Sequence, residues 1–309
     1  MCATCGCSDE SGVRVSLLGA GAPPVHRGNH HNDHHGQHEH RGNHDDHHDH
    51  HDHHDDHDDH DDHDGQQDQH EHPHHDNPDR TVVLEQQILA KNASLAERNR
   101  GRLEARGVFA VNLMSSPGAG KTTLLERTIR DLSGEVEVGV IEGDQETPLD
   151  AERIRASGRP VVQINTGAGC HLDAQMVHDA LHALDPPRGS LLFIENVGNL
   201  VCPALFDLGE ARRVVLTSVT EGADKPLKYP HMFRAADLVL VNKIDLLPYV
   251  DFDLDLFGVM LHQINPTVEI RSVSATSGNG VGAWLDWLRG QVAQRAVSPV
   301  RFDSATPRI

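Results

Sequence analysis

The sequence predicts an α/β protein: a three-layer domain with a mostly parallel sheet, preceded by a disordered His/Asp-rich N-terminal extension. Three observations predict it. From residue 80 onward, short apolar runs rich in β-branched residues alternate with polar helical segments, a pattern typical of buried parallel strands. A glycine-rich loop with a lysine follows the first run. Residues 45–64, DDHHDHHDHHDDHDDHDDHD, hold no side chain suited to an apolar core.

The folded part is expected to begin with a helix over residues 80–106. Apolar residues recur there at roughly helical spacing, at Val82, Leu84, Ile88, Leu89 and Leu95. Seven buried strands are expected at VFAVNLM (108–114), VEVGVIEG (136–143), PVVQIN (160–165), SLLFIEN (190–196), RRVVLTSV (212–219), ADLVLVN (236–242) and VEIRSVS (268–274). A last helix over 281–296 would carry Trp284, Leu285 and Leu288 on one face.

Charge divides the 309 residues into three regions. Residues 26–75 hold 15 Asp or Glu against two Arg, which accounts for −13 of the net charge of −20, and they hold 21 of the 26 histidines. We therefore separate a Cys-bearing head and linker (1–25), a disordered His/Asp-rich tract (26–79) and a globular domain (80–309).

Composition also excludes several classes of function. An acidic chain argues against nucleic-acid binding, which needs Lys and Arg for phosphates. No apolar run is long enough to span a membrane. The start, MCATCGCSDE, lacks the basic and apolar regions of a secretory signal, so a cytoplasmic location is expected. Clustered cysteines then favour metal or redox chemistry over disulfides.

The segment SSPGAGKTT (115–123) matches a phosphate-binding loop, and it predicts a P-loop NTPase domain. The match departs from the pattern at one point, where Ser115 occupies the first glycine position. Lys121 is expected to meet the β- and γ-phosphates, and Thr122 to ligate Mg²⁺. The alternative is an ordinary glycine-rich turn. The residues expected around the phosphates are Gly118, Ala119, Gly120, Lys121, Thr122 and Thr123.

The segment NKID (242–245) ends the strand ADLVLV and resembles the guanine-recognition motif of GTPases. The Asp245 carboxylate can accept from guanine N1–H and N2–H₂, a donor pair that adenine lacks. Asn242 is expected at the other edge of the base, with the stem of Lys243 along the ring. SVSA (272–275) looks like the loop that also touches guanine, through Ser274 and Ala275. GTP and GDP are therefore favoured over ATP.

Two carboxylates lie between these motifs, each at a strand end. Asp144 follows the second strand, and Glu195 ends the strand SLLFIEN. We expect both to hold Mg²⁺ or the attacking water, and to form the catalytic set with Lys121. GTPases commonly show D-x-x-G where this chain has E-N-V-G (195–198), so the identity of a general base stays open. Ordinary strand-end carboxylates are the alternative.

A metal site is expected in the domain. Cys170 and His171 follow TGAG and open a predicted helix, and Cys202 lies four residues after Gly198, in the segment expected to sense the γ-phosphate. Two thiolates and an imidazole suit Zn²⁺ or Ni²⁺ and leave a coordination position open. The alternative is that the cysteines are small buried hydrophobes.

The N-terminal regions offer further ligands. Cys2, Cys5 and Cys7 of CATCGC can wrap a soft-to-borderline cation, or they are free thiols on a disordered tail. The tract provides imidazoles that bind Ni²⁺, Zn²⁺ and Cu²⁺, so it predicts a metal reservoir rather than a solvated linker. The histidines expected to bind are His47, His48, His50, His51, His53, His54, His57, His60 and His63.

A Cys-x-x-Cys-Gly-Cys head, a His-rich tract, a phosphate loop, Cys-His with a distant Cys, and NKxD occur here in this order. The arrangement resembles one family, the nickel-hydrogenase maturation GTPases HypB, which are SIMIBI-class P-loop GTPases. SVTEGADKPLKYP (218–230) is similar to a stretch of that family. The resemblance covers about residues 80–295 and the head at 1–7; the tract occurs in only some members.

The resemblance implies a GTPase that forms a homodimer on nucleotide or metal binding. It would deliver Ni²⁺ to the [NiFe]-hydrogenase large-subunit precursor, together with a small nickel metallochaperone of the HypA type. Matched by position, the family's domain metal site is Cys170, His171 and Cys202, and its N-terminal nickel site is Cys2, Cys5 and Cys7. Its nucleotide site is Lys121, Thr122, Asn242 and Asp245.

The resulting hypothesis is a nickel-binding GTPase that stores Ni²⁺ and delivers it as GTP is hydrolysed. Because Cys202 lies close in sequence to 195–198, movement of that segment would change the metal geometry, and metal would change nucleotide affinity in return. Two alternatives stay open. One is an accessory GTPase for another nickel enzyme, such as urease. The other is a nickel storage or buffer protein whose nucleotide site controls assembly.

Overall fold

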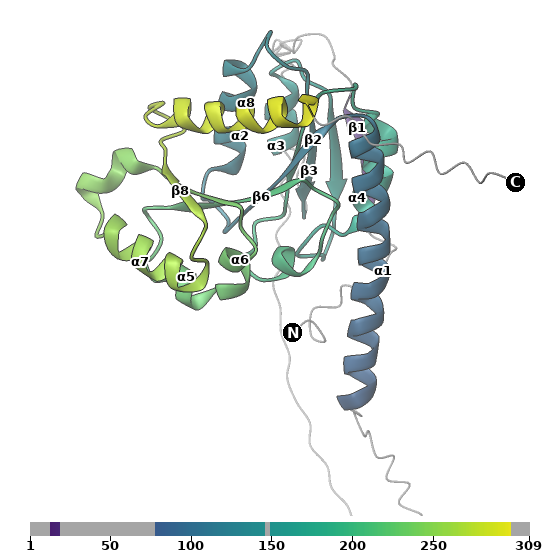
Figure 1. Ribbon diagram of the computed structural model, residues 1–309, viewed down its shortest axis with the longest axis horizontal. Helices are drawn as coiled ribbons and strands as arrows, with labels where there is room; N and C mark the ends of the chain where they lie inside the picture. Colours follow the sequence, from purple (N-terminus) through teal and green to yellow (C-terminus); the bar gives the residue numbers. More distant parts are fainter. Residues whose placement is uncertain (1–12, 19–77, 146–148, 298–309) are drawn as a thin grey trace, which may run out of the picture. The chain divides into compact units, whose positions relative to one another are not determined.

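A computed structural model describes residues 13–18, 78–145 and 149–297 of the chain. Within them the protein forms an eight-stranded sheet with the strand order β1-β4-β3-β5-β2-β6-β7-β8 (Figure 1). Every neighbouring pair is parallel except β1 and β4, which run antiparallel. The predicted mostly parallel α/β fold is confirmed.

The strands are β1 (Arg14–Leu18), β2 (Phe109–Ser115), β3 (Val138–Asp144), β4 (Val161–Asn165), β5 (Leu191–Glu195), β6 (Arg212–Ser218), β7 (Leu238–Asn242) and β8 (Glu269–Ser272). Seven of them overlap the seven apolar runs expected from the sequence. The runs of β2, β5 and β7 are buried along their whole length, as a sheet covered on both faces requires.

The helices are α1 (Pro78–Ala105), α2 (Lys121–Asp131), α3 (Leu149–Arg155), α4 (Ala174–Leu184), α5 (Lys225–Lys228), α6 (Pro230–Arg234), α7 (Leu254–Ile264) and α8 (Val281–Val297). Two short 3₁₀ segments, η3 (Cys202–Leu205) and η4 (Ile244–Tyr249), follow β5 and β7 in the chain. The two helices expected at 80–106 and 281–296 are confirmed. No helix in the described parts of the chain is both long enough and apolar enough to cross a membrane.

Helices cover both faces of the sheet, and the alternation along β2 shows how. Phe109, Val111 and Leu113 join one core, whereas Ala110 and Met114 belong to cores on the opposite face. The first core lies under α2 and α8, and the others lie under α1, α4, α6 and α7. The arrangement is the expected three-layer domain.

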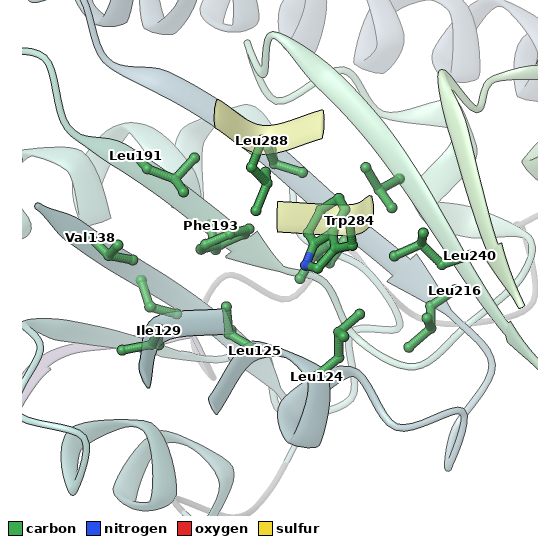
Figure 2. Close-up of a cluster of buried hydrophobic side chains, with 14 of the residues drawn as sticks. Leu124, Leu125, Ile129, Val138, Leu191, Phe193, Leu216, Leu240, Trp284 and Leu288 are labelled. Atoms are coloured by element: carbon green, nitrogen blue, oxygen red, sulfur yellow. The ribbon is translucent and has the colours of Figure 1, made fainter. Parts of the chain in front are cut away.

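Figure 2 shows the core under α2 and α8, where Trp284 of α8 lies among side chains that include Leu125 of α2 and Phe193 of β5. The Trp284 indole N–H donates to the hydroxyl of Thr128 at 2.9 Å, so its one polar atom is satisfied inside the core. This packing fixes α2, the helix that the phosphate loop leads into.

Helix α1 has a buried stripe that differs from the apolar pattern in its sequence. Asn92, Ala96 and Asn99 are buried, whereas Ile88 and Leu89 are exposed. The two asparagines are buried because their amides pair with backbone groups: Asn92 Oδ1 accepts from the N–H of Ala174 at 2.8 Å. Hydrogen bonding, rather than apolar spacing alone, therefore selects the face that packs against α4.

Strand β1 was not expected from the sequence, which placed residues 1–25 in a head and linker. RVSLL pairs antiparallel with β4 along its whole length, from Arg14 opposite Asn165 to Leu18 opposite Val161. Val15 and Leu18 pack against the cores of the domain. Residues 1–12 and 19–77 lie outside the described residues, so the roles of Cys2, Cys5, Cys7 and the tract histidines stay predictions.

Candidate nucleotide and metal sites

The expected phosphate loop joins β2 to α2. Gly118 and Gly120 have positive φ angles of 74° and 99°, and Gly120 is the N-cap of α2. A Cβ at Gly120 would lie 2.6 Å from Asn242 Nδ2, so both the backbone conformation and the available space require glycine. The loop thus places the first N–H groups of a helix where an anion is favoured.

Ser115, the one departure from the loop pattern, contacts the loop lysine. The ammonium of Lys121 donates to Ser115 Oγ at 2.9 Å, and the same hydroxyl donates to the carbonyl of Ser116 at 2.6 Å. The serine therefore orients the Lys121 ammonium, a contact that glycine could not make.

Side chains at the end of β7 brace the phosphate loop from the other side. Asn242 is buried, its Nδ2 donates to the carbonyl of Ala119 at 2.9 Å, and its Oδ1 accepts from the N–H of Ala275 at 3.1 Å. Lys243 Nζ donates to the carbonyl of Gly118 at 2.8 Å. Both polar ends of the Asn242 amide are thus engaged by backbone, so this residue joins two loops. Asp245 is exposed in the first turn of η4.

The remaining expected nucleotide residues have local partners. Ser274 is fully buried and its hydroxyl accepts from the N–H of Ser277 at 3.0 Å, which shapes the loop after β8. Thr123 Oγ1 accepts from Arg153 at 3.4 Å, close to the limit of a hydrogen bond. These contacts assign Ser274 a structural role in the loop, and they leave the contact of either residue with nucleotide as a prediction.

The hydroxyl of Thr122 donates to Glu195 Oε1 at 2.7 Å, so the structure brings these two expected residues together. Glu195 is buried, and burial raises its pKa, opposed by Lys121 and by the Thr122 hydrogen bond. Glu142 of β3 lies opposite Glu195 in the parallel pairing of β3 and β5. Burial, followed by the charges of Glu195 and Asp144, raises the pKa of Glu142 to about 9.

These carboxylates fit the hard cation that a nucleotide site needs. Glu142 Oε2 and Glu195 Oε2 are buried and have no hydrogen-bond partner in the described parts of the chain. Asp144 ends β3, in register with Asn165, and is only partly buried. Oxygen ligands of this kind suit Mg²⁺, and a cation would neutralise the repulsion that raises the Glu142 pKa.

The expected metal residues of the domain are brought together from two loops. The prediction that Cys170 and His171 open a helix is wrong, because they lie in the loop before the start of α4. The ligand atoms of Cys170, His171 and Cys202 all lie within 4.8 Å of one another, and Cys170 Sγ lies 3.6 Å from His171 Nδ1. The His171 ring stacks on Phe206 at 4.0 Å. Burial lowers the pKa of His171, opposed by Asp173, so the imidazole is neutral at pH 7 and able to bind metal. Two thiol groups and one imidazole suit Zn²⁺ or Ni²⁺.

Asn196 links the metal loop to the end of β5. Its Oδ1 accepts from the N–H of Leu172 at 3.2 Å and from that of Val197 at 3.0 Å, and its Nδ2 donates to Asn112 Oδ1 at 3.3 Å. Leu172 directly follows His171, and Asn196 directly follows Glu195. One buried amide therefore connects the two sites.

The segment between Glu195 and Cys202 also contacts both loops. A Cβ at Gly198 would lie 3.1 Å from the Cα of Pro117 in the phosphate loop. Asn199 Nδ2 donates to the carbonyl of Cys170 at 3.2 Å. A shift of this segment would thus alter contacts with the phosphate loop and with the metal ligands together.

Reasoning from the sequence missed Glu142 and Asn196. The sequence did carry a signal for Glu142, because burying a carboxylate inside the strand VGVIEGD costs free energy unless the carboxylate is neutralised or binds a cation. Asn196 had none beyond its position after Glu195, since its partners Leu172 and Asn112 are distant in the sequence.

Comparison with known proteins gives the family of the chain. The family model described as CobW/HypB/UreG, nucleotide-binding domain, matches residues 109–272. The hydrogenase maturation factor HypB of Azotobacter vinelandii is 59% identical over 216 residues, which cover 70% of this chain and 71% of that protein.

Two solved structures are similar to the chain. HypB from Archaeoglobus fulgidus is 44% identical, with a TM-score of 0.62, and the match covers 66% of this chain and 99% of that one. HypB from Helicobacter pylori in complex with nickel is 36% identical, with a TM-score of 0.63, over 69% of this chain and 100% of the other. With these matches, the chain belongs to the HypB hydrogenase maturation factors, within the CobW/HypB/UreG family of nucleotide-binding proteins.

Proposed function

We propose that this HypB protein hydrolyses GTP and uses the reaction to deliver Ni²⁺ to the [NiFe]-hydrogenase large-subunit precursor. One observation supports the coupling above all others. The chain segment that begins at Glu195, which is bonded to Thr122 of the phosphate loop, ends at Cys202 of the metal triad. A change at the γ-phosphate then has a short covalent path to a metal ligand.

In this proposal the loops around β2 and β7 bind the nucleotide. Lys121 moves from Ser115 to the β- and γ-phosphates, and the N–H groups at the start of α2 surround them. Asp245 accepts from guanine N1–H and N2–H₂. Asn242 holds the two loops on either side of the base, and the stem of Lys243, whose ammonium donates to the carbonyl of Gly118, lies along the base ring.

Thr122, Glu195 and Asp144 would hold Mg²⁺, which supplies charge neutralisation on the phosphates. Glu142, kept protonated by its high pKa, adds no negative charge beside the adjacent Glu195 in the absence of the cation. Glu195 would also orient the attacking water. The catalytic set proposed from the sequence, Lys121, Asp144 and Glu195, is retained.

Ni²⁺ is the cargo, bound by Cys170, His171 and Cys202. Zn²⁺ shares these ligands and would compete for the site. Three protein ligands leave a coordination position for a partner's ligand during handover. We expect a homodimer on nucleotide or metal binding, and a small nickel metallochaperone of the HypA type as a second partner.

The Asp245→Asn variant tests base recognition. Loss of two charge-assisted hydrogen bonds should weaken GTP binding by about 10²- to 10⁴-fold. Xanthosine triphosphate should bind more tightly than to the wild type, because its C2 oxygen accepts from the new amide. Binding is measured by competition with a fluorescent nucleotide, and Asp251→Asn, exposed in the segment after η4, is the matched control. Unchanged GTP affinity in Asp245→Asn would contradict the assignment.

The tract supports a second role, nickel storage, which deletion of residues 26–75 separates from delivery. Hydrogenase activity that survives under ample nickel but fails under scarcity would assign the tract to storage. Failure at every nickel level would place the tract on the delivery path, and no effect at either level would remove it from both roles.

A further inference from the structure

Helix α4 carries two histidines one turn apart, outside the metal triad. His178 is half-buried and His182 is exposed, and their ring centroids lie 4.5 Å apart at an interplanar angle of 63°. The i, i+4 spacing places both rings on one side of the helix. Helix α1 packs alongside α4, as Figure 1 shows at the side of the sheet that carries β1.

The hydrogen bonds of Asn99 fix the protonation of His178. Asn99 Nδ2 donates to the carbonyls of Ala174 at 2.9 Å and Leu208 at 3.1 Å, so the atom facing His178 is the amide oxygen. Because that oxygen accepts, His178 Nδ1, at 3.0 Å, must carry the proton. The lone pair of neutral His178 is therefore on Nε2.

His182 is fixed in the same tautomer by a different group. Its Nδ1 lies 2.8 Å from the carbonyl oxygen of His178, which can only accept. Both rings thus donate from Nδ1 to an oxygen and keep Nε2 for another ligand. Metal-binding histidines in proteins show this arrangement, because the outer hydrogen bond orients the ring and selects the coordinating nitrogen.

The charges around the pair are mixed. Asp179 attracts a cation to this face, whereas Arg98 and Arg102 oppose one. Arg102 has its own anionic neighbour, Asp185, at 3.7 Å, which reduces the repulsion. The surrounding charges therefore do not exclude a divalent ion. Its binding energy has to come from the Nε2 atoms of His178 and His182.

We propose that His178 and His182 form a second, two-ligand site for a borderline divalent cation such as Ni²⁺, Zn²⁺ or Cu²⁺, bound through the two Nε2 atoms. Water fills the remaining coordination positions, so the site binds weakly and exchanges its ion. It lies about one helical turn from the start of α4, which follows Cys170 and His171. The proposal is independent of GTP hydrolysis and of the triad.

The test measures how fast each histidine of the full-length chain reacts with diethyl pyrocarbonate, which acylates an imidazole nitrogen that carries a free lone pair. Mass spectrometry resolves each site, so the tract histidines do not obscure the result. NiCl₂ in a citrate buffer, which has no amine to consume the reagent, sets the free Ni²⁺ concentration. His231, an exposed histidine of α6, is the internal reference, and His231→Gln is the matched control variant.

We expect Ni²⁺ to slow modification of His178 and His182 in parallel by about ten-fold at saturation, with His231 unchanged. In His182→Ala, protection of His178 should need roughly ten-fold more free Ni²⁺. His182 is exposed, so this variant should fold, and unchanged thermal denaturation would confirm it.

Two results would overturn the site. One is no protection of His178 and His182 at Ni²⁺ concentrations that protect the tract. The other is undiminished protection of His178 in His182→Ala, which would mean that the rings only pack on each other. His171, read in the same digest, reports the triad separately, so failure here is distinguishable from failure of the proposed function.

Discussion

The nucleotide loops and the metal triad are built in contrasting ways. The loops around β2 and β7 brace each other directly, since Asn242 and Lys243 bond to the backbone of the phosphate loop. The metal ligands instead come from two segments, one before α4 and one after β5, which Asn196 and Asn199 tie together. The nucleotide frame is therefore formed in advance, whereas the metal geometry depends on a segment that starts at Glu195.

Substitution of Gly120 should have the largest effect on ligand binding, because it disrupts the contact between the phosphate loop and Asn242. Gly120→Ala introduces a Cβ 2.6 Å from Asn242 Nδ2 at a positive φ angle, and should weaken GDP binding by about 10³-fold or more. Gly134→Ala is the matched control, with φ +85° but nothing within 4 Å. It should cost stability without weakening binding. Near-normal GDP affinity in Gly120→Ala, measured with a fluorescent nucleotide, would mean that the frame is not rigid.

Loss of one thiol should weaken metal binding at the triad and leave nucleotide binding unchanged. Cys202→Ser removes one of three ligands and should weaken Ni²⁺ binding at the triad by about 10²- to 10³-fold. The readout is protection of Cys170 from alkylation under a nickel buffer, resolved by mass spectrometry. Val201→Ser, at an exposed neighbour, is the control. If Cys170 is protected equally in Cys202→Ser, the two segments do not share an ion.

Glu142→Gln should show how much the buried carboxylates destabilise the fold, because it changes how the free energy of unfolding depends on pH. The folded pKa of about 9 lies above the ordinary 4.5, so the unfolded chain releases this proton first as pH rises. Wild-type stability should therefore fall between about pH 4.5 and 9, and the neutral glutamine should not share that loss. At pH 7 without Mg²⁺ the variant should be more stable by at most about 3 kcal/mol.

Urea denaturation at several pH values measures this difference, with the exposed Glu152→Gln as control. A gap between Glu142→Gln and wild type that stays constant with pH would show that Glu142 is ionised in the folded protein.

The sequence predicted the nucleotide loops better than the connection between those loops and the metal triad. Apolar runs and the loop motif have local signals, so β2, α2 and the loop between them lie where the sequence predicted them. Strand β1 is short and has an antiparallel partner far along the chain, so RVSLL gave no usable signal. The bonds of Asn196 to Leu172 and Asn112 depend on register in the folded sheet, which no local pattern encodes.

The central claim is that the segment from Glu195 to Cys202 transmits the nucleotide state to the metal. It is tested most directly by the free Ni²⁺ concentration that half-protects Cys170 and Cys202 from alkylation, compared between the GDP form and a non-hydrolysable GTP analogue. We predict midpoints that differ by about five-fold or more in the wild type. In Asn196→Ala the two midpoints should converge. Asn265→Ala is the control, because it removes a distant amide that donates to the carbonyls of Phe233 and Ala236, and in this variant the difference between the midpoints should persist. Equal midpoints in the two nucleotide states of the wild type would contradict the account.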